Sequence, residues 1–253
     1  MSEFNNKVAV ITGGNSGIGY ATAQALIAQG AQVIITGRRQ DAIDAAVAEL
    51  GPQASGFRAD TAVLADTDAL VAHVQAHHAQ VDVLFINAGV AYFLPLALAD
   101  EAHFDSQMNI NFKGAYFTLQ KFLPLLKPGA SVIFLSSINA SLAMPGSAVY
   151  GASKAAMNVL AKVAAVELAP QQIRVNIVSP GPVVTPIFSK SGMDSATLDA
   201  FAQNMQSRLP LRRFGQPEEI ATLVTYLAGE GSAWVTGQEF VIDGGALVTP
   251  PVG

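Results

Sequence analysis

The chain reads Val8-Ala9-Val10-Ile11-Thr12-Gly13-Gly14-Asn15-Ser16-Gly17-Ile18-Gly19 close to its N-terminus. The apolar run that opens this stretch is rich in β-branched residues and predicts a buried strand, and an Ala-rich helical segment follows the glycines. Glycines at positions 13, 17 and 19 let the backbone turn sharply and approach a pyrophosphate closely. The N-terminus of the next helix then offers unpaired N–H groups and a positive dipole end to that anion. This unit of strand, loop and helix predicts a dinucleotide site.

Further apolar runs recur along the chain, and they are nearly continuous, as strands buried on both faces are. They are Val33–Ile35, Val81–Ile86, Val132–Leu135 and Val175–Val178. Ala-rich segments with helical spacing separate them: Tyr20–Gln29, Ala42–Leu50, Asp66–Ala79, Ala155–Leu168 and Glu218–Ala228. The alternation predicts an α/β fold, with a single-domain Rossmann-type doubly wound parallel sheet flanked by helices on both faces. We expect one domain over residues 1–253, with a lid excursion at about 183–210, where this rhythm breaks.

The composition argues against several function classes. Of the 253 residues, 51% are hydrophobic and only 13% are charged, which indicates a large core and apolar surface hidden between subunits. The net charge of −5 argues against nucleic-acid binding. The absence of cysteine excludes a thiolate metal site or a cysteine nucleophile, and it fits a cytoplasmic protein. The longest uncharged stretch, Pro128–Ser153, is broken by Gly and Pro, so we expect no membrane span and no secretory signal.

The pattern Thr-Gly-x-x-x-Gly-x-Gly at residues 12–19 resembles the glycine motif of the short-chain dehydrogenase/reductase family, and other landmarks of that family follow in order. These are Asn87-Ala88-Gly89, Asn111 in Asn-Ile-Asn-Phe-Lys-Gly, Ser137, Tyr150-Gly-Ala-Ser-Lys154, Pro180-Gly181 with Thr185, and Asp243-Gly244-Gly245. Ile86 departs from the family, which usually has a second Asn there. The resemblance covers essentially the whole chain. It implies the compact oxidoreductase branch and a nicotinamide cofactor.

The end of the second predicted strand indicates which nicotinamide cofactor binds. An NAD site needs a carboxylate roughly 20 residues after the glycine loop to bind the ribose 2′-OH, but Gly37 stands there, followed by Arg38 and Arg39. Arginine can chelate a 2′-phosphate with its planar fork, and the resemblance also assigns NADP(H) to a chain with Arg38 here. Asp41 is the counter-argument, because it could reach a ribose; alternatively, it is an acid facing the helix dipole.

The resemblance implies further cofactor contacts. Asp60 would accept a hydrogen bond from the exocyclic amine of adenine, and Thr185 would bind the nicotinamide carboxamide with help from the backbone of Val183. In a structural reading, Asp60 is an ordinary loop acid and Thr185 merely precedes Pro186. The remaining expected contacts are Gly13, Asn15, Ser16, Gly17, Ile18, Gly19, Asn87, Ala88, Gly89, Tyr150, Lys154, Pro180 and Gly181.

Four residues form the expected catalytic group. Tyr150 and Lys154 are four apart and share one face of a helix. A free tyrosine has a pKa of about 10, and a neighbouring ammonium would lower it. Ser137 can hold the carbonyl oxygen, Lys154 would also hold the ribose, and by resemblance Asn111 holds a water that links Lys154 to solvent. Taken alone, Tyr150 and Lys154 could be an ordinary pair on a helix surface, and Ser137 could be a turn residue or a helix cap. The order and spacing of all three residues together favour catalysis.

The histidines predict no metal centre. His73 and His77 have a spacing that could bind a metal, but no third ligand is evident and their helix should face solvent. His103 stands among acidic residues at a helix start and should lie at the surface.

The substrate pocket is expected to be formed by three segments: residues 91–96, 138–147 and 183–208. Its candidate walls are Phe93, Leu94, Leu142, Met144, Ile187, Phe188, Met193 and Met205. These side chains favour an apolar, roomy pocket for aromatic or medium-chain ketones.

The sequence thus predicts an NADP(H)-dependent carbonyl reductase or alcohol dehydrogenase acting on a small molecule. A 3-oxoacyl-thioester reductase is an alternative within the class. A lyase or epimerase is a second alternative, although such members tend to be longer. A nucleotide-sensing regulator is a third, and these typically lack the Tyr/Lys pair. The resemblance also implies a homotetramer packed through helices around 112–126 and 151–168.

Overall fold

Seven parallel strands form the centre of the fold, in the order β3-β2-β1-β4-β5-β6-β7. The computed structural model describes residues 3–185 and 195–248, and only the backbone of residues 195–201. The strands are β1 Val8–Ile11, β2 Gln32–Gly37, β3 Ala54–Arg58, β4 Val81–Ile86, β5 Leu126–Leu135, β6 Arg174–Pro180 and β7 Glu239–Ile242. The chain leaves β1 in one direction and returns to its other side with β4, which opens a crevice at the carboxyl edge. The predicted doubly wound parallel sheet is confirmed.

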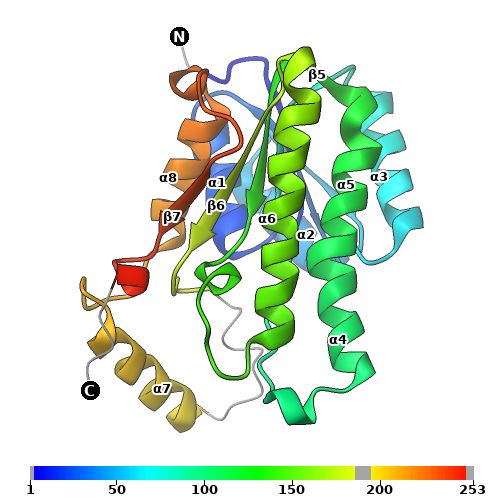
Figure 1. Ribbon diagram of the computed structural model, residues 1–253. Coiled ribbons are helices and arrows are strands. Elements are labelled where there is room, and N and C mark those ends of the chain that lie inside the picture. The colour runs from blue at the N-terminus through cyan, green and yellow to red at the C-terminus, as the bar shows by residue number, and fades with distance from the viewer. Residues whose placement is uncertain (1–2, 186–194, 249–253) are drawn as a thin grey trace.

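Two layers of helices cover the sheet (Figure 1). One face packs against α3 (Leu64–His77), α5 (Ala115–Phe122) and α6 (Ala148–Leu168), which contribute apolar side chains to one core cluster. The other face packs against α1 (Gly17–Ile27), α2 (Gln40–Leu50) and α8 (Pro217–Ala228). Two further helices, α4 (Glu101–Met108) and α7 (Ser195–Arg208), lie beyond the carboxyl edge of the sheet.

Burial on both faces explains the continuous apolar runs of the central strands. All six residues of β4 are buried, including Asp82. The Asp82 carboxylate accepts a hydrogen bond from the backbone N–H of Val8, 2.8 Å away, and pairs with Lys127. A charge in a buried strand is thus held by a partner at the amino edge, away from the crevice.

Several predicted elements differ from the observed ones at their ends. The helix expected at 155–168 begins at Ala148, so Tyr150 lies in its first turn. The strand expected at 132–135 begins at Leu126, because its first residues pair with the start of β4. Within the expected excursion, α7 occupies residues 195–208, and a bridge between Val183 and Gly215 joins the two flanking segments. In the described part of the chain, no helix combines the length and apolarity that crossing a membrane requires.

Candidate active site

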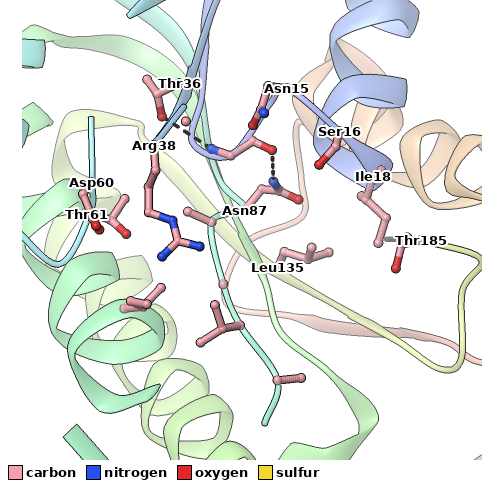
Figure 2. A pocket seen from close by; sticks show the side chains of 18 of the residues that line it. Asn15, Ser16, Ile18, Thr36, Arg38, Asp60, Thr61, Asn87, Leu135 and Thr185 are labelled. Atoms are coloured by element: carbon pink, nitrogen blue, oxygen red, sulfur yellow. Dashed lines mark hydrogen bonds between the residues drawn. The ribbon is translucent and has the colours of Figure 1, made fainter. Parts of the chain in front are cut away.

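A cleft opens at the carboxyl edge where β1 and β4 diverge (Figure 2). It is bordered by the glycine loop, the end of β2, the loop after β3 and the segment after β4. Its lining residues are Gly13, Asn15, Ser16, Gly17, Ile18, Thr36, Gly37, Arg38, Ala59, Asp60, Thr61, Asn87, Ala88, Gly89, Val90, Ala91, Tyr92, Ile110, Leu135 and Thr185. Parallel strands bring these distant residues together because their carboxyl ends meet at one edge.

The glycine loop forms an anion-binding cradle. Gly13 and Gly17 have φ angles of 65° and 55°, a region that favours glycine. A Cβ on Gly19 would lie 2.6 Å from the Asn87 Nδ2 atom, so the loop and the segment after β4 touch only because this position is bare. Ser16 caps α1 without a side-chain hydrogen bond, and no acid occupies the first turn of α1. The helix N-terminus therefore keeps N–H donors for a phosphate, which fits a dinucleotide.

The Asn87 side chain holds this loop in place through hydrogen bonds to its backbone. Its Nδ2 group donates to the carbonyl oxygens of Thr12, at 2.8 Å, and Gly13, at 3.0 Å. The Thr12 hydroxyl oxygen accepts from the backbone N–H groups of Asn87 and Ala88, both at 3.0 Å. The Asn87 amide is thus engaged with the chain itself, and its contribution to a ligand is to hold the loop in shape.

The two arginines after β2 lie in different surroundings. Arg38 lines the cleft, is exposed and takes part in no ion pair found among the described residues; Figure 2 shows its guanidinium extending into the cleft near Asp60 and Thr61. Arg39 instead pairs with Asp41 at 3.6 Å on the outer surface. The pairing of Asp41 with Arg39 supports its reading as a surface helix acid. Among the described residues, Arg38 is the basic side chain that lines the cleft and could meet a ligand phosphate.

Asp60 has one carboxylate oxygen free for a ligand. Its Oδ1 atom accepts from the backbone N–H of Ala62 at 3.0 Å, and its own N–H donates to Asp66 at 2.9 Å. These bonds fix the loop after β3, and Asp60 lines the cleft as expected for an adenine contact.

Three side chains converge next to Leu135, which lines the cleft, although none of the three is itself among the lining residues in the described structure. Ser137 follows β5, Tyr150 lies in the first turn of α6, and the Ser137 hydroxyl is hydrogen-bonded to that of Tyr150. Lys154, one turn further along α6, donates from Nζ to the carbonyl oxygen of Leu135 at 2.7 Å. The same Nζ lies 6.0 Å from the centroid of the Tyr150 ring. All three residues are buried.

The pKa shifts in this group differ from the simple expectation. Burial raises the pKa of Tyr150, and the hydrogen bond from Ser137 partly opposes that rise. Burial also lowers the pKa of Lys154 from 10.5 to about 8. The expected lowering of the Tyr150 pKa by the Lys154 ammonium is therefore absent in the chain by itself, because desolvation disfavours both charged forms. A phenol with a raised pKa remains a proton donor at neutral pH.

Asn111 lies in a π-helical turn, Asn109–Gly114, between α4 and α5. Its Oδ1 atom accepts from the N–H of Val90 and its Nδ2 group donates to the Val90 carbonyl oxygen, both at 2.9 Å. Nδ2 also reaches the Ser153 hydroxyl at 3.0 Å. A Cβ on Gly89 would lie 3.2 Å from Asn111 Oδ1 and 3.4 Å from Lys154 Nζ, so both groups meet beneath Gly89. The water expected on Asn111 stays a prediction.

The segments predicted to form the substrate pocket meet beside Tyr150. The Leu94 N–H donates to the Gly146 carbonyl oxygen at 2.9 Å, which joins residues 91–96 to 138–147. The Phe93 ring packs edge-on against Tyr150, with centroids 5.8 Å apart. Met205 is described on α7, whereas Ile187, Phe188 and Met193 lie outside the described residues.

The residues expected around the nicotinamide lie near the end of β6. Thr185 lines the cleft (Figure 2), but Pro180, Gly181 and Val183 are not among its lining residues in the described structure. Gly181 packs against Asp243, since a Cβ there would lie 2.7 Å from the Asp243 Cα. Val183 forms the bridge to Gly215.

Sequence reasoning missed several lining residues. They are Thr36, Gly37, Ala59, Thr61, Val90, Ile110 and Leu135. Most are ordinary residue types whose only distinction is their position at a strand end. A general signal existed for those after strands, because ligands bind outside the carboxyl ends of parallel strands.

The histidines form no metal centre in the described residues, where no group of three or more suitable ligands gathers. His73 and His77 stack with ring centroids 4.4 Å apart, and His77 Nδ1 bonds to the His73 carbonyl oxygen at 2.8 Å. His103 is half-buried rather than a freely exposed surface residue, because its ring contacts Gln107 at 3.0 Å.

Comparison with known proteins places this chain in a family. Residues 13–246 match the family model described as enoyl-(acyl carrier protein) reductase. The chain is 38% identical to an oxidoreductase of Sarocladium schorii, with 97% of each chain covered. It is 36% identical to the 3-oxoacyl-(acyl-carrier-protein) reductase FabG of Thermotoga maritima, covering 96% of this chain and 98% of that one.

A solved structure agrees with these relatives. The crystal structure of a short-chain dehydrogenase/reductase described as glucose/ribitol dehydrogenase, from Brucella melitensis, is 32% identical. It superposes with a TM-score of 0.90 over 96% of this chain and 98% of that one. Fold, site geometry and sequence relatives agree: the chain is an oxidoreductase of the short-chain dehydrogenase/reductase family, which uses a nicotinamide cofactor.

Proposed function

We propose that this protein is an NADP(H)-dependent oxidoreductase that interconverts a ketone or aldehyde and the corresponding alcohol. The observation that carries the proposal is the convergence of Ser137, Tyr150 and Lys154 beside the cleft, where Lys154 reaches its lining residue Leu135. The glycine cradle in the cleft fits a dinucleotide phosphate. Membership of an oxidoreductase family supports the reaction class.

The side chains suit proton transfer to a carbonyl oxygen. When bound, NADPH supplies the hydride that the carbonyl carbon accepts. The Ser137 and Tyr150 hydroxyls would hold the carbonyl oxygen, and Tyr150 would give its phenolic proton to that oxygen as negative charge develops. In the oxidative direction, the Tyr150 phenolate would take the proton of the alcohol. Lys154 would hold the ribose hydroxyls and pass protons toward Tyr150.

Arg38 supports NADP(H) over NAD(H), because it is the basic residue lining the cleft in the described part of the chain and takes part in no ion pair there. Replacing Arg38 by Asp is expected to lower the ratio of kcat/KM for NADPH to that for NADH by about 10- to 100-fold, since a charge-assisted hydrogen bond is lost and repulsion is added. Initial rates with each cofactor measure this ratio.

Arg39→Asp is the matched control. Arg39 pairs with Asp41 outside the cleft, so the same charge change at the neighbouring position should leave the cofactor ratio within about threefold of the wild type. An unchanged ratio in Arg38→Asp, or an equal shift in both variants, would remove Arg38 as the phosphate contact.

A panel of ketones and alcohols, followed by the absorbance of NADPH and then of NADH, tests the proposed function. We propose an apolar substrate, because Phe93 packs on Tyr150 and the neighbouring loops carry Leu94, Leu142 and Met144. Bulky apolar ketones should therefore react faster than charged ones. Equal rates on both classes would refute the apolar preference, and no NADPH-linked turnover of any member would refute the function.

A 3-oxoacyl-thioester is the second candidate substrate class. The 36% identity to the Thermotoga maritima reductase, over nearly the full length of both chains, favours it. The panel therefore includes acetoacetyl-coenzyme A beside a simple ketone of similar size. A kcat/KM for the thioester well above that for every simple ketone would select this candidate.

We also propose self-association into a homotetramer. Val159, Val163 and Val166 form an exposed apolar stripe along α6, and Tyr116 on α5 is exposed as well. A second copy of the chain is an occupant that would bury this stripe. Sedimentation at micromolar concentration should give a mass about four times 26.3 kDa. Val163→Asp should lower that mass, and a monomeric wild type would contradict the proposal.

A further inference from the structure

The cleft wall between Gly89 and Pro95 has no secondary structure of its own. Side chains from the helix that runs beside it hold its backbone groups instead. Asn111 bonds both the N–H and the carbonyl oxygen of Val90, and the Gln107 Oε1 atom accepts from the Tyr92 N–H at 3.0 Å. Two amide side chains thus fix alternate residues of one extended segment, as a neighbouring strand would.

Gln107 is fully buried, and its amide orientation is determined by its partners. Because Oε1 accepts from the Tyr92 N–H, the Nε2 group must be the donor toward His103 Nε2, 3.0 Å away. That ring nitrogen must then be the unprotonated one. Reversing the amide would set two donors against each other at Tyr92. The contacts form one directed chain, from Tyr92 through Gln107 to His103.

The Tyr92 end of this chain of contacts lies beside the reacting groups. Tyr92 lines the cleft, and the next residue, Phe93, packs its ring against Tyr150. A shift of the Tyr92 backbone would move the Phe93 ring, which borders the substrate side of Tyr150. Gln107 itself is not among the residues that line the cleft.

We infer that Gln107 is a positioning residue, which holds the Tyr92 backbone so that Phe93 forms a fixed wall for the carbonyl substrate beside Tyr150. The inference rests on the proposed function. It predicts an effect on the binding of the ketone rather than on that of NADPH. A merely structural role would lower stability and weaken both ligands together.

The test compares Gln107→Met with Gln107→Glu. Methionine has a similar length but cannot accept a hydrogen bond from the Tyr92 N–H, so the Tyr92 backbone and the Phe93 ring would no longer be held in place. Glutamate keeps an acceptor for Tyr92 and can accept from His103 when its Nε2 carries the proton. Gln120→Met, at an exposed position on α5, is the matched control.

We expect Gln107→Met to raise KM for an apolar ketone by about tenfold, the equivalent of one buried hydrogen bond, while the Kd of NADPH by calorimetry changes less than about threefold. Gln107→Glu should return KM to within about threefold of the wild type, and Gln120→Met should leave it there. Hydrogen exchange of the peptide over 90–95 should be faster in Gln107→Met alone. This readout does not depend on activity.

Unchanged KM and exchange in Gln107→Met would overturn the inference. So would an equal weakening of ketone and NADPH that glutamate does not rescue, since that pattern indicates a structural role. A wild-type chain that reduces no ketone would instead refute the proposed function. A wild-type chain that reduces ketones, combined with a Gln107→Met variant whose KM and hydrogen exchange do not change, refutes this inference alone.

Discussion

Tyr150→Phe is expected to lower kcat for ketone reduction by about 10²- to 10⁴-fold, the range assigned to a positioned general acid. The phenolic proton is lost, while the ring that packs against Phe93 is kept. The Kd of NADPH should stay within about threefold, because one hydroxyl contact among many is removed. Stopped-flow turnover and calorimetry measure the two quantities.

Tyr226→Phe provides the matched control, since Tyr226 is exposed on α8, outside the proposed subunit interface, and the variant should lose no activity. More than about a tenth of the wild-type kcat in Tyr150→Phe would contradict the acid role. The pH dependence gives a second check. Because burial raises the pKa of Tyr150, the phenol stays protonated at neutral pH, so the rate of ketone reduction should not change with pH there. Oxidation needs the phenolate and should rise with pH.

Lys154→Met is expected to abolish most activity and yet increase the stability of the fold at pH 7. Activity should fall by about 10²-fold or more, because the proton path and the ribose contact are both lost. Burial lowers the pKa of Lys154 to about 8, so at pH 7 the folded state carries a desolvated ammonium. Methionine removes that cost and keeps the shape of the side chain.

The sign of the pH dependence follows from the two pKa values. Between the folded pKa of about 8 and the ordinary value of 10.5, the unfolded chain binds more protons, so wild-type stability rises with pH. Below pH 8 the folded wild type bears the full free-energy cost of its buried ammonium, on the order of 3 kcal/mol at about 1.4 kcal/mol per pKa unit. In Lys154→Met the gain from removing this cost is reduced by the loss of the hydrogen bond to Leu135. Lys154→Met should therefore gain about 1–2 kcal/mol at pH 7 and lose that advantage by pH 10.

Urea unfolding of both proteins at pH 7 and pH 10 measures this difference. The conservative comparison is Lys162→Met, at an exposed position on the same helix, where neither stability nor its pH dependence should change. A Lys154→Met protein that is less stable than the wild type at pH 7 would show that the buried ammonium carries no net free-energy penalty. So would one whose free energy of unfolding differs from the wild type by the same amount at both pH values.

Local sequence was enough to predict the layers of this fold, and together with the family resemblance it pointed to the candidate catalytic residues, whose roles stay predictions. The β-branched run at Val8–Ile11 and its successors are buried strands, because only a parallel sheet covers both faces of such runs. The glycines at 13 and 17 adopt positive φ angles, which give the sharp turn that the glycine motif predicted. The spacing of Tyr150 and Lys154 brings both to one side of α6. These features depend on neighbours within a few residues, so pattern reasoning reaches them.

Contacts between distant segments account for the rest. The family resemblance favoured Arg38 as the phosphate contact, and only the folded chain shows that Arg39 pairs with Asp41 while Arg38 lines the cleft. The pKa shifts of Tyr150 and Lys154 arise from burial by other elements, which no local pattern reports. Gln107 reads as an ordinary helix residue until folding encloses it against Tyr92 and His103. Burial, and contacts between residues distant in the sequence, arise only in the packed molecule. They shift the pKa values of Tyr150 and Lys154 and enclose Gln107 against its partners.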